Sequence, residues 1–222
     1  MEELDLPFGE GEVDIIISEW MGYFLLYESM LDCVLWARDK YLNKETGKML
    51  PDRAHMYIAA IEDSQYMHEK KSFWDNVYGV DMSVMSTSIF KDPVVDTVPS
   101  DAIMSDYCCI LDIDLVKMKK EEVNFSSYYT LTMSYTDKVH ALVCWFDTSF
   151  SDLKCPAVLS TSPYRKYTHW KQSVLYLDKP LDVRKGDVLS GSIATRQDTK
   201  NFRALNIKVS YHLDNHTKKH FF

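Results

Sequence analysis

The stretch EEVNFSSYYTLTMSY, residues 121–135, decides the fold class of this 222-residue chain. Apolar side chains occupy every second position along it, with one interruption at Ser127. These positions are Val123, Phe125, Tyr129, Leu131, Met133 and Tyr135. A period of two is typical of a strand with one face buried and the other face in water. The stretch therefore predicts a strand of an antiparallel sheet.

The same period recurs elsewhere in the chain. It covers residues 139–145 and 205–213, and residues 54–61 begin another β-like run. Short turn-like segments such as residues 184–187 separate the runs. Repeated alternating strands joined by short turns predict an antiparallel β-barrel or sandwich. We therefore expect a mainly β domain over residues 51–222.

The first 50 residues follow a different pattern. Residues 13–17 are mostly apolar and β-branched, which predicts a strand buried on both faces, as in a parallel sheet. From Glu28 onward apolar residues recur at helical spacing, which predicts an amphipathic helix that ends near Gly47. One strand–loop–helix unit cannot form a sheet with both faces covered. We therefore expect residues 1–50 to be the C-terminal remnant of an α/β domain.

Residues 63–90 interrupt the series of predicted strands. Phe73, Trp74, Val77 and Tyr78 lie at helical spacing, so we expect a helical insertion between two strands of the barrel. Its aromatic content is high for a connection. Two interpretations remain open: a helix that caps the barrel core, or an arm that binds a partner.

Composition and charge narrow the classes of function. Apolar residues make up 46% of the chain, which is enough for a sizeable core. The net charge of −8 makes nucleic acid and anionic membranes poor partners and favours a cationic substrate. The five cysteines form no CxxC motif and indicate reduced, buried thiols in an intracellular protein. No glycine-rich phosphate-binding motif and no metal site is indicated.

Two glutamates stand out in DIIISEWMGYFLLYESML, residues 14–31. Glu19 follows the predicted strand, where α/β sheets bind ligands, and Glu28 begins the predicted helix. A loop that doubles back would bring the two carboxylates together, and a planar guanidinium with its five donors suits such a pair. A glycosidase also uses paired carboxylates, and two unrelated surface acids would give the same spacing.

The chain is similar to the protein arginine methyltransferases in stretches that follow the family's order. The stretches SPYRKYTHWKQSVLYL (162–177) and NFRALNIKVSYHL (201–213) follow the family's order. Four further matches are SEWMGYFLLYESML (18–31), LPDRAHMYIAAIED (50–63), FWDNVYGVDMS (73–83) and YTHWKQ (167–172). They resemble the family's double-glutamate loop, barrel entry, dimerisation arm and Thr-His-Trp loop. The resemblance extends over essentially the whole chain and is to type I members, which make asymmetric dimethylarginine from S-adenosylmethionine. It implies a barrel preceded by the remnant of a Rossmann-like methyltransferase domain.

The resemblance also implies roles for individual residues. Glu19 and Glu28 would be catalytic and would clamp the substrate guanidinium. The residues implied to bind substrate are Met21, Tyr23, Tyr27, His169 and Trp170. Glu2 and Met30 would contact the cofactor. The family's glycine-rich cofactor-binding turn does not precede Met1, so we expect the S-adenosylmethionine site to lie mostly outside this chain and the isolated chain to be inactive.

The resemblance finally implies partners and a location. Substrates would be arginine-containing proteins, with Gly/Arg-rich segments of histones or RNA-binding proteins as examples. The arm would form a homodimer, with no direct contact to nucleic acid or membrane, in the cytoplasm and nucleus. The alternative function is a non-catalytic β-barrel that serves as a protein-interaction module.

Overall fold

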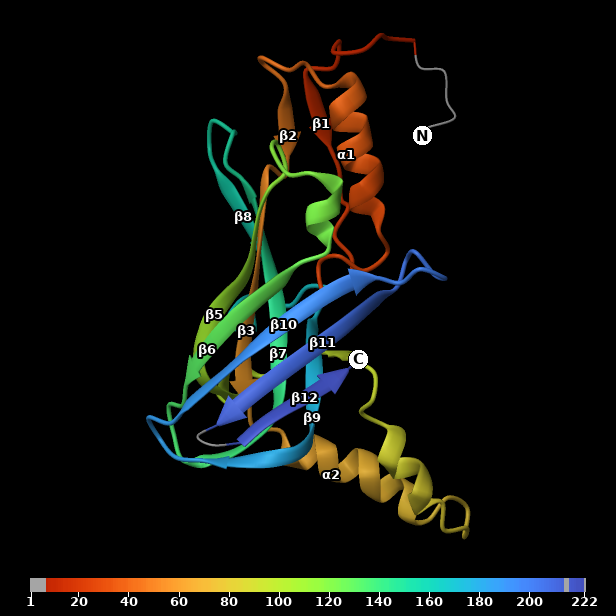
Figure 1. The fold of residues 1–222 in the computed structure, drawn as a ribbon, viewed down its shortest axis with the longest axis vertical. Helices are drawn as coiled ribbons and strands as arrows, with labels where there is room; N and C mark the ends of the chain where they lie inside the picture. Colours follow the sequence, from red (N-terminus) through yellow and green to blue (C-terminus); the bar gives the residue numbers. More distant parts are fainter. Residues whose placement is uncertain (1–6, 214–215, 222) are drawn as a thin grey trace.

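The computed structural model describes residues 7–213 and 216–221, and its strands form three sheets (Figure 1). The two-stranded parallel sheet contains β1 (Ile15–Ile17) and β2 (Lys48–Leu50). The four-stranded sheet has the order β12 (His216–Phe221), β11 (Leu205–Leu213), β10 (Val188–Gln197) and β6 (Ser126–Thr132). The six-stranded sheet has the order β4 (Val94–Asp96), β9 (Gln172–Val183), β7 (Asp137–Phe150), β3 (Arg53–Ile61) and β5 (Ile103–Asp114), and β8 (Ala157–Ser160) pairs with β7.

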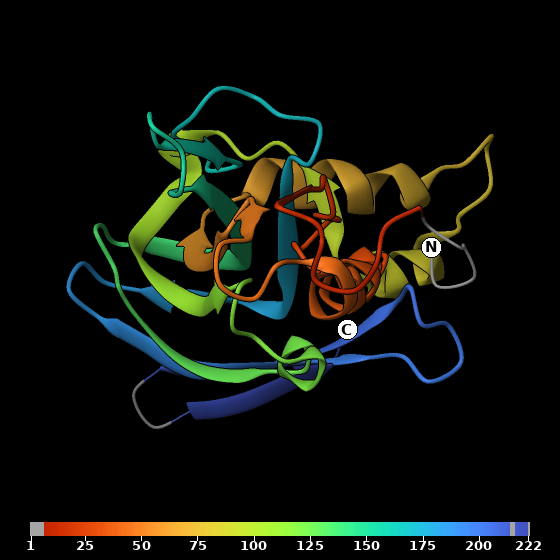
Figure 2. The same ribbon diagram turned by 90° about the horizontal axis from the view of Figure 1, so that it is seen from above.

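The two larger sheets are antiparallel and face each other as layers (Figure 2). A bridge between Ser105 of β5 and Met133, which follows β6, joins them along one side. The main core lies between the layers and includes Ile58, Leu131 and Leu189, which are fully buried. The prediction of a mainly β, antiparallel barrel or sandwich with a helical insertion is confirmed.

The alternating pattern corresponds to the observed burial in the four-stranded sheet. Tyr129 and Leu131 of β6 are buried, whereas the side chain of Tyr128, which lies on the opposite face of the same strand, is 86% exposed. In β11, Ile207 and Val209 are buried in the same way. The period of two therefore correctly predicted which side chains of this sheet face the core.

Strand β7 differs from that expectation because both of its faces are buried. Every residue from 139 to 146 is buried, although only alternate positions were expected to be. Leu142 and Phe146 belong to the main core, whereas Val143 and Trp145 belong to a second cluster on the outer face of the sheet. The segments that cover this outer face include α2 and β4, which contribute Met67 and Val94. Tertiary covering, not local pattern, therefore sets the burial of β7.

The first unit is shorter and more open than predicted. Strand β1 pairs only with β2, and Ile15 and Ile17 are 51% and 76% exposed. The prediction of burial on both faces is wrong for the described chain, because Val13 and Ile16 pack against the core while Ile15 and Ile17 face away from it. Helix α1 (Met30–Tyr41) ends well before Gly47 and is followed by a turn into β2. The domain boundary after residue 50 stays a prediction.

The insertion is helical only in part. Helix α2 (Ser64–Ser72) leads into short 3₁₀ turns η1 (Phe73–Asp75) and η2 (Ser83–Ser88); two further turns are η3 (Ser100–Ala102) and η4 (Lys120–Val123). The helix predicted from the spacing of the aromatic residues does not extend to Val77 and Tyr78. They lie in a turn closed by hydrogen bonds between the peptide groups of Val77 and Val80, with positive φ at Tyr78 and Gly79.

The cysteines are free, but most are not buried. Cys33, Cys109 and Cys155 are exposed, Cys108 is half-buried and Cys144 is buried. The expectation of buried thiols therefore holds only for Cys144, whose position on β7 is covered on both sides. Separately, no helix within the described residues is both long and apolar enough to cross a membrane.

Candidate functional site: the double-glutamate loop

The loop between β1 and α1 doubles back on itself, as expected. The amide of Gly22 donates to the carbonyl of Leu25 at 3.0 Å, and the amide of Tyr27 donates to the carbonyl of Tyr23 at 3.1 Å. Gly22 is required for this close approach, because a Cβ atom there would lie 1.9 Å from the carbonyl oxygen of Tyr27. The sequence Met-Gly-Tyr therefore specifies a compact turn.

The loop is strained and firmly anchored. Phe24, Leu25, Glu28 and Ser29 all have positive φ, a region that non-glycine residues rarely adopt. Such backbone persists only where the surroundings fix it, and it is frequent at functional sites. Here the anchors are apolar: the side chains of Phe24 and Leu25 are buried in the main core, as is that of Trp20 at the start of the loop.

The two glutamates point out of this core. Glu19 and Glu28 are both exposed, so the apolar residues around them in the sequence anchor the loop and do not enclose the carboxylates. Within the described chain Glu19 has no ion-pair partner. Glu28 receives a hydrogen bond from the guanidinium of Arg203, with 3.0 Å between Nη2 and Oε2. One carboxylate of the loop thus already binds a guanidinium.

The barrel contributes the predicted Thr-His-Trp residues to the same region. Trp170 is buried, and its indole Nε1 donates to the carbonyl of Met21 at 2.8 Å. His169 is exposed and lies against Trp170, with 3.8 Å between the ring centroids and 34° between the ring planes. The structure therefore brings the Trp170 loop against the double-glutamate loop. The nitrogen Nε1 of Trp20 and the hydroxyl of Thr168 are buried without a hydrogen-bond partner in the described residues.

The other predicted substrate residues lie at the loop surface or beneath it. Tyr23 and Tyr27 are 40% and 38% exposed, whereas Met21 is buried. Tyrosines at these positions can flank a ligand held by the glutamates. Their roles stay predictions.

Sequence reasoning did not assign the β10–β11 hairpin to this site. Figure 1 shows the end of this hairpin near the start of α1, and its residues Gln197 and Arg203 contact Ser29 and Glu28 of the loop. The pair Arg203–Glu28 is separated by 175 positions in the sequence. The available signals were the opposite charges of Arg203 and Glu28 and the resemblance of residues 201–213 to the family, and neither indicated that the two side chains would meet.

The described residues do not by themselves fit S-adenosylmethionine. Glu2 lies outside the described residues, and Met30 is 47% exposed at the first position of α1. A single exposed thioether offers no partner for the charged and hydroxyl groups of that cofactor. Only the guanidinium side of the predicted chemistry can be derived from this chain.

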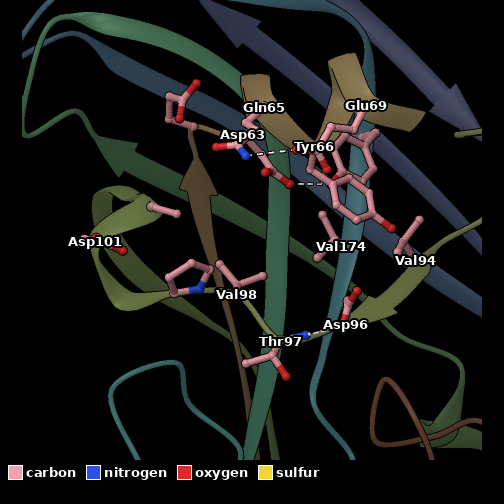
Figure 3. A pocket seen from close by; sticks show the side chains of 14 residues that line it. Asp63, Gln65, Tyr66, Glu69, Val94, Asp96, Thr97, Val98, Asp101 and Val174 are labelled. Carbon is pink, nitrogen blue, oxygen red and sulfur yellow. Dashed lines mark hydrogen bonds between the residues drawn. The ribbon is translucent and has the colours of Figure 1, made fainter. Parts of the chain in front are cut away.

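A hollow lies beside α2 (Figure 3), and Figure 1 shows α2 at the end of the barrel opposite α1. Its volume is about 450 Å³, and its wall is acidic, with Glu69, Asp96 and Asp101 among the lining residues. Burial raises the pKa of Asp63, whose carboxylate accepts a hydrogen bond from the hydroxyl of Tyr176. None of the residues predicted from the sequence to bind substrate or cofactor lines this hollow.

A family model and curated relatives both relate this chain to the protein arginine methyltransferases. Residues 52–216 match the family described as the arginine methyltransferase oligomerization subdomain. The chain is 50% identical over 211 residues to Protein arginine N-methyltransferase 1 of Schizosaccharomyces pombe and 46% identical over 211 residues to that of Dictyostelium discoideum, with 95% of this chain covered in both. Each comparison covers 61% of the relative, so the chain spans less than two thirds of these curated relatives.

Solved structures show the same fold. A chain of the Trypanosoma brucei PRMT1 enzyme–prozyme heterotetrameric complex with AdoHcy superposes with a TM-score of 0.90 at 37% identity, covering 100% of this chain and 71% of that one. Arabidopsis thaliana protein arginine methyltransferase 10 superposes with a TM-score of 0.82 at 26% identity, covering 99% of this chain and 72% of that one.

Proposed function

The chain belongs to the protein arginine methyltransferase family, and from this premise we propose that it forms the arginine-binding and oligomerisation portion of such an enzyme. The observation that carries the proposal is the contact between Glu28 and a guanidinium within the chain itself. A rigid loop that presents an exposed carboxylate to a guanidinium has the chemistry that a substrate arginine needs.

The proposed roles follow from the geometry of the loop. Glu28 and Glu19 hold the substrate guanidinium by charge-assisted hydrogen bonds, and the tyrosines at 23 and 27 flank it. Trp170 fixes the loop through the carbonyl of Met21. The unpartnered Nε1 of Trp20 and hydroxyl of Thr168 support a site completed by groups outside the described residues. Held in this way, the arginine is oriented with one terminal nitrogen directed away from the carboxylates.

The remaining properties are proposed from the family. The methyl donor is S-adenosylmethionine, the product is asymmetric dimethylarginine, and substrates are proteins with Gly/Arg-rich segments. The exposed arm over residues 63–90 forms a homodimer. The protein acts in the cytoplasm and nucleus, which imaging of a fluorescent fusion checks directly.

Glu28→Gln is the test of the clamp. The variant is made in a chimera in which this chain replaces the matched 61% of the S. pombe relative. Methyl transfer to a Gly/Arg-rich peptide should fall by a factor on the order of 100, because the amide loses the charge that holds the guanidinium. The fold should be unaffected, since the side chain is exposed.

Glu45→Gln serves as the matched control. Glu45 is also exposed, and it lies in the turn after α1, away from the loop, so its substitution removes the same charge. Its turnover should equal that of the unmodified chimera. Near-normal turnover of Glu28→Gln would contradict the proposal that Glu28 holds the substrate guanidinium.

The second candidate is a non-catalytic interaction module. The exposed apolar side chains of the arm favour binding to another protein, with Tyr78 fully exposed and Phe73 61% exposed. If partner binding persists in chimeras that show no transfer even with intact Glu19 and Glu28, this second function replaces the first.

A further inference from the structure

We propose that the β10–β11 hairpin is a positioning element of the arginine site, with Arg203 as the residue that orients the carboxylate of Glu28. The inference rests on the proposed function and adds Gln197 and Arg203, for which the sequence predicted no role. It starts from the contacts between residues 197–203 and the last turn of the loop before α1.

Four hydrogen bonds tie the hairpin to Glu28 and Ser29. The amide of Glu28 donates to the carbonyl of Arg203 at 2.8 Å, and the guanidinium of Arg203 returns a bond to Oε2 of Glu28 at 3.0 Å. The buried hydroxyl of Ser29 donates to the carbonyl of Phe202 and accepts from Nε2 of Gln197, the latter at 3.0 Å. Backbone and side chain of the strained turn are thus both fixed from the barrel.

The hairpin itself is rigid enough for this task. Asp198 Oδ1 accepts hydrogen bonds from the amides of Lys200 and Asn201 at 2.8 Å each, and Oδ2 accepts from Asn206 at 3.1 Å. These bonds also hold the pKa of Asp198 below its ordinary value. The amide of Asp198 donates to the carbonyl of Ala204 at 2.9 Å, which closes the base of the turn.

The contact leaves room for a second guanidinium. Arg203 approaches only Oε2 of Glu28, and Oε1 makes no hydrogen bond with the described residues. A carboxylate accepts bonds on both oxygens, so one arginine can hold it while another binds. Because the carbonyl of Arg203 is bonded to the amide of Glu28, the arginine stays beside the carboxylate when a substrate enters.

The kinetic test compares Arg203→Gln with Arg203→Lys in the chimera described above. Arg203→Gln should raise the KM for a Gly/Arg-rich peptide about threefold to fivefold with kcat within about a factor of two, because an exposed ion pair contributes modestly to ground-state positioning. Arg203→Lys should recover most of the loss, since the charge is retained. Arg53→Gln is the control: Arg53 forms partly exposed ion pairs with Asp112 and Asp114 on the barrel, outside the double-glutamate loop.

A structural readout uses the chain by itself and needs no activity. Hydrogen exchange of residues 22–32 should be faster in Gln197→Ala and in Arg203→Gln than in the unmodified chain, and unchanged in Arg53→Gln. Unchanged exchange in both hairpin variants would overturn the proposal. So would a lower KM for Arg203→Gln, which would make Arg203 a competitor that substrate displaces.

The failure of the two proposals can be told apart. If Glu28→Gln retains normal turnover, the clamp is wrong whatever the hairpin does. If Glu28→Gln loses turnover while Arg203→Gln has an unchanged KM, the clamp stands and the positioning role of the hairpin is rejected.

Discussion

At the scale of single residues, the exposure of the glutamates is the informative feature. The sequence places two carboxylates within an apolar stretch, and the structure separates the two kinds of side chain. Trp20, Phe24 and Leu25 enter the core, while Glu19 and Glu28 face outward. The apolar residues fix the loop, and in the proposed site this fixed backbone would hold the two surface carboxylates in position for one shape of ligand.

The double variant Glu19→Gln/Glu28→Gln should be little worse than either single variant. Two groups that bind one guanidinium act as a unit, so the loss of either removes most of the effect. Methyl-transfer rates of the three chimeras, compared at saturating cofactor, give the answer. If the fold-loss in methyl-transfer rate of the double variant equals the product of the two single losses, the two glutamates act independently.

Gly22→Ala should disrupt the loop. The added Cβ would lie 1.9 Å from the carbonyl oxygen of Tyr27, and backbone cannot move aside as a flexible side chain can. We expect a loss of roughly 1–3 kcal/mol in the free energy of unfolding, measured with urea, together with faster proteolysis of the loop. Gly9→Ala is the control, because its Cβ would meet only the end of Glu12 at 3.3 Å and stability should be unchanged.

At the scale of elements, the arm (residues 63–90) buries few of its own apolar side chains against the barrel. Only Met67 among the residues of α2 is buried, and Phe73, Tyr78 and Val84 beyond it are exposed. Exposed aromatic and aliphatic side chains on a projecting segment are typical of a surface that binds another protein chain. The match to an oligomerization subdomain agrees with this feature.

Tyr78→Ala should weaken self-association of the chimera about tenfold or more, because large aromatic residues dominate interface energetics. Tyr128→Ala is the matched control: Tyr128 is 86% exposed on β6, so the same apolar area is removed elsewhere. Sedimentation velocity over a concentration series measures both. Equal dissociation constants for the two variants would exclude Tyr78 from the interface.

At the scale of the whole molecule, two regions are separated by the length of the barrel. The double-glutamate loop lies near α1, and the acidic hollow and arm lie at the other end (Figure 1). The barrel therefore connects the proposed arginine site to the proposed oligomer interface. Its continuous antiparallel sheets give a rigid frame between them.

The chain by itself should not bind S-adenosylmethionine in the micromolar range. The described residues offer that cofactor little besides the exposed thioether of Met30. Isothermal calorimetry should give no heat of binding with the isolated chain and a clear isotherm with the chimera. Micromolar binding by the isolated chain would contradict this and would point to a cofactor site in the barrel.

The sequence by itself determined the fold class and the motif residues. The period of two at residues 126–132 and 205–213 identified inward faces, because local alternation follows directly from strand geometry. The Met-Gly-Tyr turn and its flanking glutamates were also visible locally. Their order along the chain predicted Glu19 after a strand, as observed, and Glu28 at the start of a helix, whereas α1 begins two residues later at Met30.

Only the tertiary structure decided which surfaces are covered and which distant residues meet. Both faces of β7 are buried because the insertion packs over the sheet, whereas Ile17 of β1 is exposed because only one neighbour pairs with that strand. The contact between Arg203 and Glu28 follows from the position of the β10–β11 hairpin beside α1, across 175 residues of sequence. Periodicity reports which side of an element is apolar, but sheet order and loop placement decide what lies against it.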